Sequence, residues 1–219
     1  MRDEPIVQYV QHWGGDLSVV NSARCSFGKR VDKIEERDKK LINYLAKNEH
    51  TTPYRHAGAT FLITCPIFVA RQIHKHQVGV SVNETSGRYV QMDPNDYHHP
   101  GMWREAAASV KQGSAATPAE GQTDLHEAYA RAIRTAYDTY EQLITSGVCK
   151  EQARMVLPQS MLTQFWMSAS LQAWAHFYTL RIDSHAQKEV QAYAAEIDKV
   201  MKTHFPHSWE ALTQRKTDV

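Results

Sequence analysis

Apolar side chains recur every three or four residues along two long stretches in the C-terminal half of the chain. The first begins at Leu125 and continues to Gly147, a residue suited to ending a helix because glycine readily adopts the left-handed backbone conformation. The second covers residues 186–202 and is followed by Pro206, which cannot continue a helix. This spacing predicts two long amphipathic helices and a mostly helical C-terminal half.

Patterns typical of strands and helices alternate in the N-terminal third. Residues 6–10 are predicted to form a short strand, because β-branched and aromatic residues dominate the segment. Residues 32–47 mix charged and apolar positions at helical spacing, which predicts a surface helix with Leu41, Ile42 and Leu45 on its inner face.

A buried strand is expected at residues 56–65, where small, β-branched and aromatic side chains follow one another. Pro66 comes next, at a position where the first turn of a helix tolerates proline. The apolar face of that helix would consist of Ile67, Phe68, Ala70 and Ile73. The sequence therefore predicts an α/β (α+β) fold, a twisted sheet flanked by helices.

Residues 93–122 interrupt these patterns. The segment is rich in turn-forming residues and then in small polar residues without periodicity, and we interpret it as a mobile loop or an insertion. A chain of 219 residues can bury one sizeable core, so we expect residues 1–219 to form a single domain.

The charge balance and the hydropathy exclude some classes of protein. The 25 Lys and Arg residues nearly cancel the 24 Asp and Glu residues, so the chain lacks the basic field of a nucleic-acid binding module. Any anion site must therefore be local. No apolar run approaches the roughly 20 residues of a membrane span, and the N-terminus does not resemble a signal peptide. We expect a cytoplasmic protein without a membrane partner.

The cysteines and histidines suggest no metal site. The three cysteines, Cys25, Cys65 and Cys149, are widely separated in the sequence, and no two of them form a CxxC pair. We therefore expect reduced, partly buried thiols. A metal-dependent hydrolase is an alternative, because His74, His76 and other histidines cluster. These two would diverge on a helix, however, and no HExxH pair occurs, so we predict no metal.

The candidate chemistry is concentrated in residues 71–89. Within them, Ser86 offers a hydroxyl and Arg88 a guanidinium, and Gly87 between them lets a ligand come close to the backbone. Such a segment can bind a phosphate. An ordinary polar loop is the alternative. Lys75 and His76 add positive charge nearby, although a solvated helix face would also explain them.

This segment is similar to the signature of the flavin-dependent thymidylate synthases, in which an Arg-His-Arg triplet precedes NExSGRY. Asn83–Tyr89 reads NETSGRY, and eight residues separate Ser86 from Gln77, the last position of the triplet. Further blocks resemble the family in the same order: SARCSFG, HTTP, PIFVARQ, ARMVLP and LRIDSHAQ. Several blocks at compatible spacing favour membership over coincidence.

The resemblance implies an enzyme that converts dUMP to dTMP with FAD, NADPH and methylene-tetrahydrofolate, and a homotetramer with shared active sites. The residues implied to bind dUMP are Gln72, Lys75, Glu84, Thr85, Ser86, Gly87, Arg88, Arg154 and Arg181. Those implied to bind FAD are Thr52, Lys75, His76, Gln77, Glu84, Ser170 and His176. Arg181 is implied to be catalytic, since a fixed cation stabilises negative charge that develops on the pyrimidine. The alternative is that Arg181 pairs with Asp183.

The resemblance also implies that reduced flavin supplies the hydride, so no enzyme thiol has to add to the pyrimidine, and Cys25 and Cys65 are expected to be packing residues. The chain departs from the signature at Lys75 and Gln77, where arginines are expected. Arg55, Ser170 and His176 also replace expected acid or amide residues. These departures leave open a variant pyrimidine-nucleotide hydroxymethylase on the same scaffold.

Overall fold

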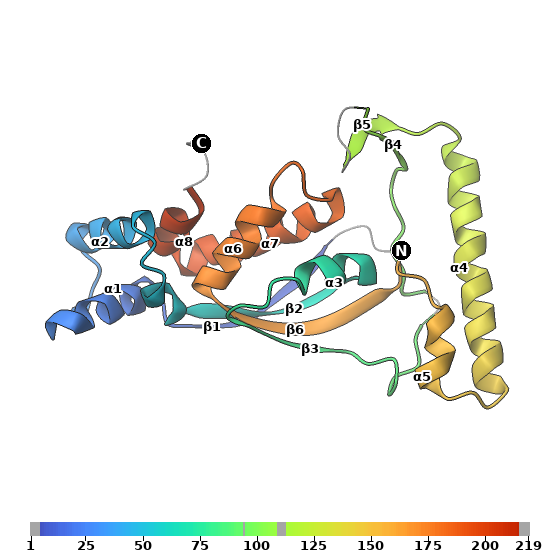
Figure 1. Ribbon diagram of the computed structural model, residues 1–219, viewed down its shortest axis with the longest axis horizontal. Coiled ribbons are helices and arrows are strands. Elements are labelled where there is room, and N and C mark those ends of the chain that lie inside the picture. The colour runs from blue at the N-terminus through green and yellow to red at the C-terminus, as the bar shows by residue number, and fades with distance from the viewer. Residues whose placement is uncertain (1–4, 94, 109–112, 215–219) are drawn as a thin grey trace. The chain divides into compact units, whose positions relative to one another are not determined.

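The protein is described by a computed structural model that covers residues 5–93, 95–108 and 113–214 (Figure 1). Its internal contacts divide the chain into two compact units. We call one the sheet unit, which comprises Ile6–Ile63, Gln72–Asn83 and the chain from Phe165 onward. The other, the α4 unit, comprises Thr64–Arg71 and Glu84–Gln164 together with Pro5. The chain passes between the units several times, and the prediction of a single domain stays a prediction.

The described chain contains both strands and helices, as the hydrophobic pattern predicts. The strands are β1 (Ile6–Trp13), β2 (Gly58–Pro66), β3 (Val80–Glu84), β4 (Arg104–Ala106), β5 (Ser114–Pro118) and β6 (Leu162–Ser170). The α-helices are α1 (Asp16–Arg24), α2 (Glu36–Lys47), α3 (Ile67–Ile73), α4 (Gln122–Thr145), α5 (Lys150–Ala153), α6 (Leu171–Arg181), α7 (Lys188–His204) and α8 (Pro206–Thr213). The 3₁₀ helices are η1 (Cys25–Phe27), η2 (Thr52–Arg55) and η3 (Arg154–Val156). The predicted fold class and the helical C-terminal half are confirmed.

A four-stranded antiparallel sheet has the strand order β1-β2-β6-β3 (Figure 1). The inner strand β2 is buried along almost its whole length, which explains its small and β-branched sequence. In β6, by contrast, burial alternates with the period of a strand. Phe165 and Met167 are buried, whereas Trp166 between them is 45% exposed. One face of β6 therefore packs into the core and the other is open.

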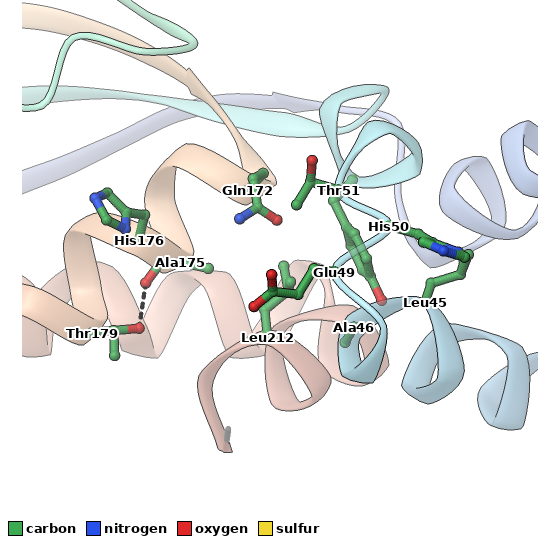
Figure 2. Close-up of a pocket in the computed structure, with 11 residues that line it drawn as sticks. Leu45, Ala46, Glu49, His50, Thr51, Gln172, Ala175, His176, Thr179 and Leu212 are labelled. Carbon is green, nitrogen blue, oxygen red and sulfur yellow. Dashed lines mark hydrogen bonds between the residues drawn. The ribbon is translucent and has the colours of Figure 1, made fainter. Parts of the chain in front are cut away.

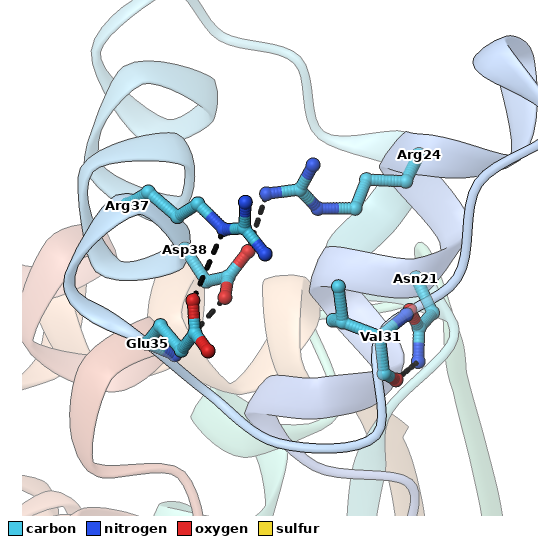
Figure 3. Close-up of polar contacts among 6 residues, drawn as sticks. All are labelled: Asn21, Arg24, Val31, Glu35, Arg37 and Asp38. Carbon is cyan, nitrogen blue, oxygen red and sulfur yellow. Dashed lines mark hydrogen bonds and ion pairs between the residues drawn. The ribbon is translucent and has the colours of Figure 1, made fainter.

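The connection between α1 and α2 is fixed by polar contacts (Figure 3). The carboxylate of Asp38 is completely buried, pairs with Arg24 and accepts a hydrogen bond from the backbone N–H of Glu35 at 3.0 Å. Burial by itself raises the pKa of Asp38, but the Glu35 N–H and the Arg24 guanidinium outweigh it and hold the pKa below its ordinary value. The amide of Asn21 bonds both backbone groups of Val31, at 2.9 Å each.

The last helix of the sheet unit is tied to the first. Asp16 begins α1, and its buried carboxylate accepts hydrogen bonds from the backbone N–H groups of His207 and Ser208, both at 2.9 Å. These N–H groups belong to the first turn of α8, where a helix has no backbone partners of its own and favours negative charge. Asp16 thus caps α8 from a position near the other end of the sequence.

Most predicted elements are present, but some boundaries differ. The helix predicted at 32–47 begins at Glu36, because Glu35 and Asp38 form a capping box that ends the preceding loop. Pro66 does not open a helix; it is the last residue of β2, and α3 begins one residue later. The segment 93–122 contains the antiparallel pair β4 and β5, which the absence of periodicity did not predict. Its mobility stays a prediction, and residues 94 and 109–112 lie outside the described chain.

Helix α4 confirms the predicted helix and extends it by three residues toward the N-terminus. Its buried residues are Ile133, Tyr137 and Tyr140, whereas Leu125 on the same predicted face is 39% exposed. Gly147 follows the helix with a φ of +84°, the conformation expected for a residue that ends a helix. The N-terminal part of the apolar face predicted for this helix is therefore not fully covered by the described part of the chain.

The cysteines differ in environment. Cys65 is buried in β2, and burial together with the nearby Glu84 raises the pKa of its thiol. Cys25 and Cys149 are exposed, so the predictions that all three thiols are partly buried and that Cys25 is a packing residue are wrong. Cys25 lies in η1 at the surface end of α1, beyond the buried part of that helix.

Candidate active site

A cavity of about 450 Å³ lies in the sheet unit, between the turn that follows α3 and the two ends of α6. Six of the residues predicted to bind FAD or dUMP line it: Lys75, His76, Gln77, Ser170, His176 and Arg181. The other lining residues are Thr51, Arg55, Val78, Gly79, Gln172, Ala173 and Leu180. Thr52, predicted as an FAD contact, is exposed and does not line the cavity, while its neighbour Thr51 does.

The wall of the cavity is fixed where the turn after α3 meets the start of α6. The hydroxyl of Ser170 accepts a hydrogen bond from the N–H of Ala173 at 3.2 Å and caps α6, while the Ser170 N–H donates to the carbonyl of Gly79 at 3.1 Å. Gly79 has a φ of +72°, and a Cβ there would lie 3.0 Å from the Ser170 hydroxyl. Glycine is therefore required, and the turn that presents Lys75, His76 and Gln77 is held close to α6.

The charge around the cavity has one sign. Arg55, Lys75 and Arg181 line it, and none of its described lining residues carries a carboxylate. Within the described chain Arg55 has no acidic partner; its Nη2 lies 3.4 Å from Oγ1 of Thr51. Lys75 likewise forms no ion pair among residues 5–93, 95–108 and 113–214. Unpaired cations around a concave surface favour an anionic ligand.

Arg181 is held at the end of α6 by contacts with the turn after α3. Its Nε donates a hydrogen bond to Nε2 of His76 at 3.0 Å, and its Nη2 donates to the carbonyl of Gln72 at 3.2 Å. Within the described chain Arg181 forms no ion pair with Asp183, the alternative partner; Asp183 accepts hydrogen bonds from the backbone N–H and the ring of His185, both at 2.9 Å. Gln72 itself, predicted to bind dUMP, donates through its side chain to Gln187.

His76 is neutral in this arrangement. Burial, the guanidinium of Arg181 and the neighbouring His176 together lower the pKa of His76 to about 4. Its ring also packs edge to face on His176 and Phe177, with centroid distances of 5.7 and 5.1 Å. An uncharged imidazole can accept a hydrogen bond, so the charge at this end of the cavity belongs to Arg181.

A second cavity of about 480 Å³ lies beside the first in the sheet unit (Figure 2). Thr51, Gln172 and His176 line both cavities. The second is further lined by the loop that follows α2, where Glu49 has a φ of +58° and precedes His50. Figure 2 shows the Glu49 carboxylate and the Gln172 amide among the side chains that line this cavity. The two cavities thus differ in charge, because a carboxylate lines only the second.

The remaining predicted residues lie in the α4 unit, at and after the end of β3. Glu84 accepts a hydrogen bond from Oγ1 of Thr163 at 2.6 Å, and the N–H of Thr85 donates to the carbonyl of Gln164 at 2.9 Å. The side chain of Ser86 accepts from the N–H of Arg88 at 3.3 Å. These contacts fix the backbone of the segment that the sequence predicts to cradle a phosphate.

Two arginines accompany this segment. A Cβ on the buried Gly87 would lie 3.2 Å from Cδ of Arg154, so the absence of a side chain allows Arg154 to approach the loop. Arg88 forms an ion pair with Glu151 at 3.0 Å, and both side chains are more than half exposed. Arg154 and Arg88 are thus brought to one loop, and solvent reaches the ion pair of Arg88.

The predicted nucleotide site is therefore divided between the units. The sheet unit contains Gln72, Lys75 and Arg181, and the α4 unit contains Glu84, Thr85, Ser86, Gly87, Arg88 and Arg154. Sequence reasoning missed Thr51 and Gln172, which line both cavities of the sheet unit. The position of Thr51 within the HTTP block could have indicated it; Gln172 carried no such signal.

The structure also bears on the alternatives. No group of three or more His, Cys, Asp or Glu residues able to hold a metal ion occurs in the described ranges. None of the helices in this part of the chain is both long and apolar enough to pass through a lipid bilayer.

A four-stranded antiparallel sheet flanked by helices, a cationic cavity and a glycine-containing loop flanked by arginines define a protein suited to binding phosphate-bearing small molecules. A family model described as thymidylate synthase complementing protein matches residues 8–207. The chain therefore belongs to that family. This membership confirms the resemblance to the flavin-dependent thymidylate synthases and the prediction that the chain is an enzyme.

Individual relatives agree with this assignment. The chain is 38% identical over 213 residues to a flavin-dependent thymidylate synthase of Thermosipho africanus, covering 95% of this chain and 91% of the relative. It is 36% identical over 215 residues to one of Thermus thermophilus, covering 97% and 77%. The solved UMP/dUMP methylase PolB from Streptomyces cacaoi, bound with 5-Br UMP, superposes with a TM-score of 0.85 at 27% identity, covering 97% of this chain and 95% of PolB.

Proposed function

We propose that this enzyme methylates dUMP to dTMP, with methylene-tetrahydrofolate as the carbon donor and FAD, reduced by NADPH, as the source of hydride. One observation carries the proposal. The cavity of the sheet unit gathers Lys75, His76 and Arg181 in a carboxylate-free environment, in a chain whose relatives bear the name flavin-dependent thymidylate synthase.

The cavity residues fit a flavin nucleotide. In the part of the chain that the structure describes, Arg55 and Lys75 have no acidic partner, which suits a diphosphate. Thr51, Gln77 and Ser170 offer neutral polar groups. FAD would supply a hydride equivalent for the reduction of the transferred carbon. The protein's own contribution is to bind, to orient and to provide fixed charge.

Arg181 is the proposed catalytic residue. A guanidinium has five N–H donors, and the described structure engages one on Nε and one on Nη2, which leaves three for a ligand. Placed against a pyrimidine, these donors would stabilise the negative charge that makes C5 nucleophilic, without exchanging a proton. Ser86, Gly87, Arg88 and Arg154 of the α4 unit are proposed to bind the phosphate of dUMP.

We also propose a homotetramer in which several subunits contribute to each active site. Uncovered apolar residues support assembly: Leu125 of α4 and Trp166 of β6 are 39% and 45% exposed, and Met155 of η3 is 79% exposed. Sedimentation of the protein with FAD tests the number of subunits. We retain the prediction that the enzyme acts in the cytoplasm.

The substrate and the product require separate tests. PolB is named a UMP/dUMP methylase, so UMP is a second candidate substrate for this chain. A hydroxymethylated pyrimidine nucleotide is the other candidate product.

The decisive experiment incubates protein, FAD, NADPH and methylene-tetrahydrofolate with dUMP or UMP and identifies the product by mass spectrometry. We expect dTMP from dUMP and less than about a tenth of that rate from UMP, whose additional 2′-hydroxyl the site would have to accommodate. Arg30→Ala, a change at an exposed residue outside both cavities, serves as the control and should leave turnover unchanged. If the protein binds no flavin and forms no pyrimidine product, the proposed function is wrong.

A further inference from the structure

The contact between His76 and Arg181 joins two segments far apart in the sequence. The residues are 105 positions apart, and the hydrogen bond links the turn after α3 to the last turn of α6. Both side chains line the cationic cavity, and both are partly buried. A hydrogen bond made to a charged group in such a place is worth more than one at the open surface.

The roles of donor and acceptor are fixed by chemistry. A guanidinium only donates, so Nε2 of His76 must carry a lone pair and the ring proton must lie on Nδ1. A protonated His76 could not accept this bond and would repel Arg181. The charged or titratable residues that line the cavity with His76 are Arg181 and His176 from α6, Lys75 beside it and Arg55 from η2. None of these four is acidic, so none of them favours protonation of the ring.

The second group that holds Arg181 in place is a backbone carbonyl. The carbonyl of Gln72 accepts from Nη2, so the guanidinium is held at two of its nitrogens, by one side chain and one carbonyl. Two acceptors at different nitrogens define the plane of a guanidinium, since the group is planar and rigid. Loss of His76 would leave a single bond, about which the group can rotate.

We propose that His76 is a positioning residue for Arg181: as a neutral hydrogen-bond acceptor, it fixes the plane and the orientation of the guanidinium that faces the substrate pyrimidine. The proposal rests on the function proposed above for Arg181, and it assigns to His76 a task separate from contact with the flavin. His76 acts through Arg181, so its importance depends on an arginine at position 181.

The first test detects the hydrogen bond between His76 and Arg181 without an activity measurement. Nitrogen-15 NMR of the full-length protein labelled at histidine, with the His76 signal assigned by its loss in His76→Phe, reports the ring's protonation and tautomer. We expect a neutral ring with its proton on Nδ1 in the wild type, and an upward shift of its pKa in Arg181→Met. That pKa should stay below the ordinary value, because burial remains. An imidazole that titrates identically in both proteins would overturn the proposal.

The second test measures coupling in dUMP binding, by calorimetry in the presence of FAD. His76→Phe keeps an aromatic ring but removes the acceptor, and we expect it to weaken dUMP binding roughly 10-fold. His76→Gln retains an uncharged acceptor and should recover most of the loss. In the Arg181→Met background, His76→Phe should have no further effect on dUMP binding. His56→Phe, at an exposed histidine outside the cavity, is the control.

The results separate the explanations. If His76→Phe weakens dUMP binding equally with or without Arg181, or if it weakens only FAD binding, His76 does not act through Arg181. If the wild type binds neither FAD nor dUMP, the proposed function fails, while the NMR measurement still decides whether Arg181 controls the imidazole. Arg181→Met leaves His76 in place, so that measurement does not depend on the folding of a His76 variant.

Discussion

We predict that Arg55 supplies the positive charge for FAD binding that Gln77 lacks, since the family signature has an arginine at that position. Both residues line the cationic cavity, and within the described chain Arg55 has no acidic partner that would have to be displaced by a phosphate. A hydrogen bond to a charged group contributes about 1.5–3 kcal/mol. Because Arg55 is exposed and solvent screens its charge, we take the lower end of that range, which corresponds to roughly a 10-fold change in a dissociation constant.

The prediction is tested with a double-mutant cycle at positions 55 and 77, in which the FAD dissociation constant of each variant is measured by flavin fluorescence. Arg55→Ala should weaken FAD binding roughly 10-fold. Gln77→Arg should weaken it slightly in the wild type, since a further cation would join Arg55, Lys75 and Arg181. In the Arg55→Ala background the same Gln77→Arg change should tighten binding, because it restores the missing charge. Arg30→Ala is the matched control.

Salt provides an independent measurement. An exposed ionic contact is screened as the Debye length falls from about 10 Å at 0.1 M to about 3 Å at 1 M. The difference between Arg55→Ala and the wild type should therefore shrink at high salt. The reasoning is refuted if Gln77→Arg tightens FAD binding in the wild type while Arg55→Ala has no effect at either salt concentration.

Three further predictions follow from contacts described above. Arg88→Ala should weaken dUMP binding roughly 10-fold in calorimetry but change the turnover number at saturating dUMP less than twofold, and an equal loss of turnover would contradict a phosphate-binding role. Replacing the exposed Cys25 and Cys149 together by serine should leave turnover unchanged, whereas a folded variant that binds dUMP but does not turn over would point to a thiol nucleophile. Arg24→Met should lower the free energy of unfolding by about 3 kcal/mol near neutral pH, because the Asp38 carboxylate stays buried without its partner. The lowered pKa of Asp38 means that its stabilisation is present above the unfolded pKa and lost as pH falls through the folded pKa, so the variant's deficit in urea titrations should shrink in acid.

Local patterns predicted some elements well and could not predict others. The long helices α4 and α7 have apolar residues on one face and polar residues on the other, which is the contrast that a periodicity search detects. Helix α6 carries much of the site but was not predicted. Its own apolar residues are distributed around most of the helix, so the contrast between an apolar and a polar face is missing. The start of α2 was misplaced because glutamate is not a preferred N-cap residue.

The candidate site shows the same limit. The turn after α3 and the end of α6 are far apart in the sequence, so only the resemblance to a family placed His76 and Arg181 in one site. Nothing in either segment indicated the hydrogen bond between them. The exposure of Cys25 could not be predicted either: the apolar Phe27 beside it is also exposed, so side-chain polarity does not indicate burial around η1.

The cap that Asp16 places on α8 has a consequence for synthesis. A ribosome makes Asp16 among the first residues of the chain, but the N–H groups of His207 and Ser208 emerge 191 and 192 residues later. Until then the carboxylate lacks both of these hydrogen bonds. The contact between Asp16 and α8 therefore forms only after residues 207 and 208 have been synthesised. A nonsense mutation upstream of Pro206 would release a chain that lacks α8 and therefore both of these hydrogen bonds to Asp16.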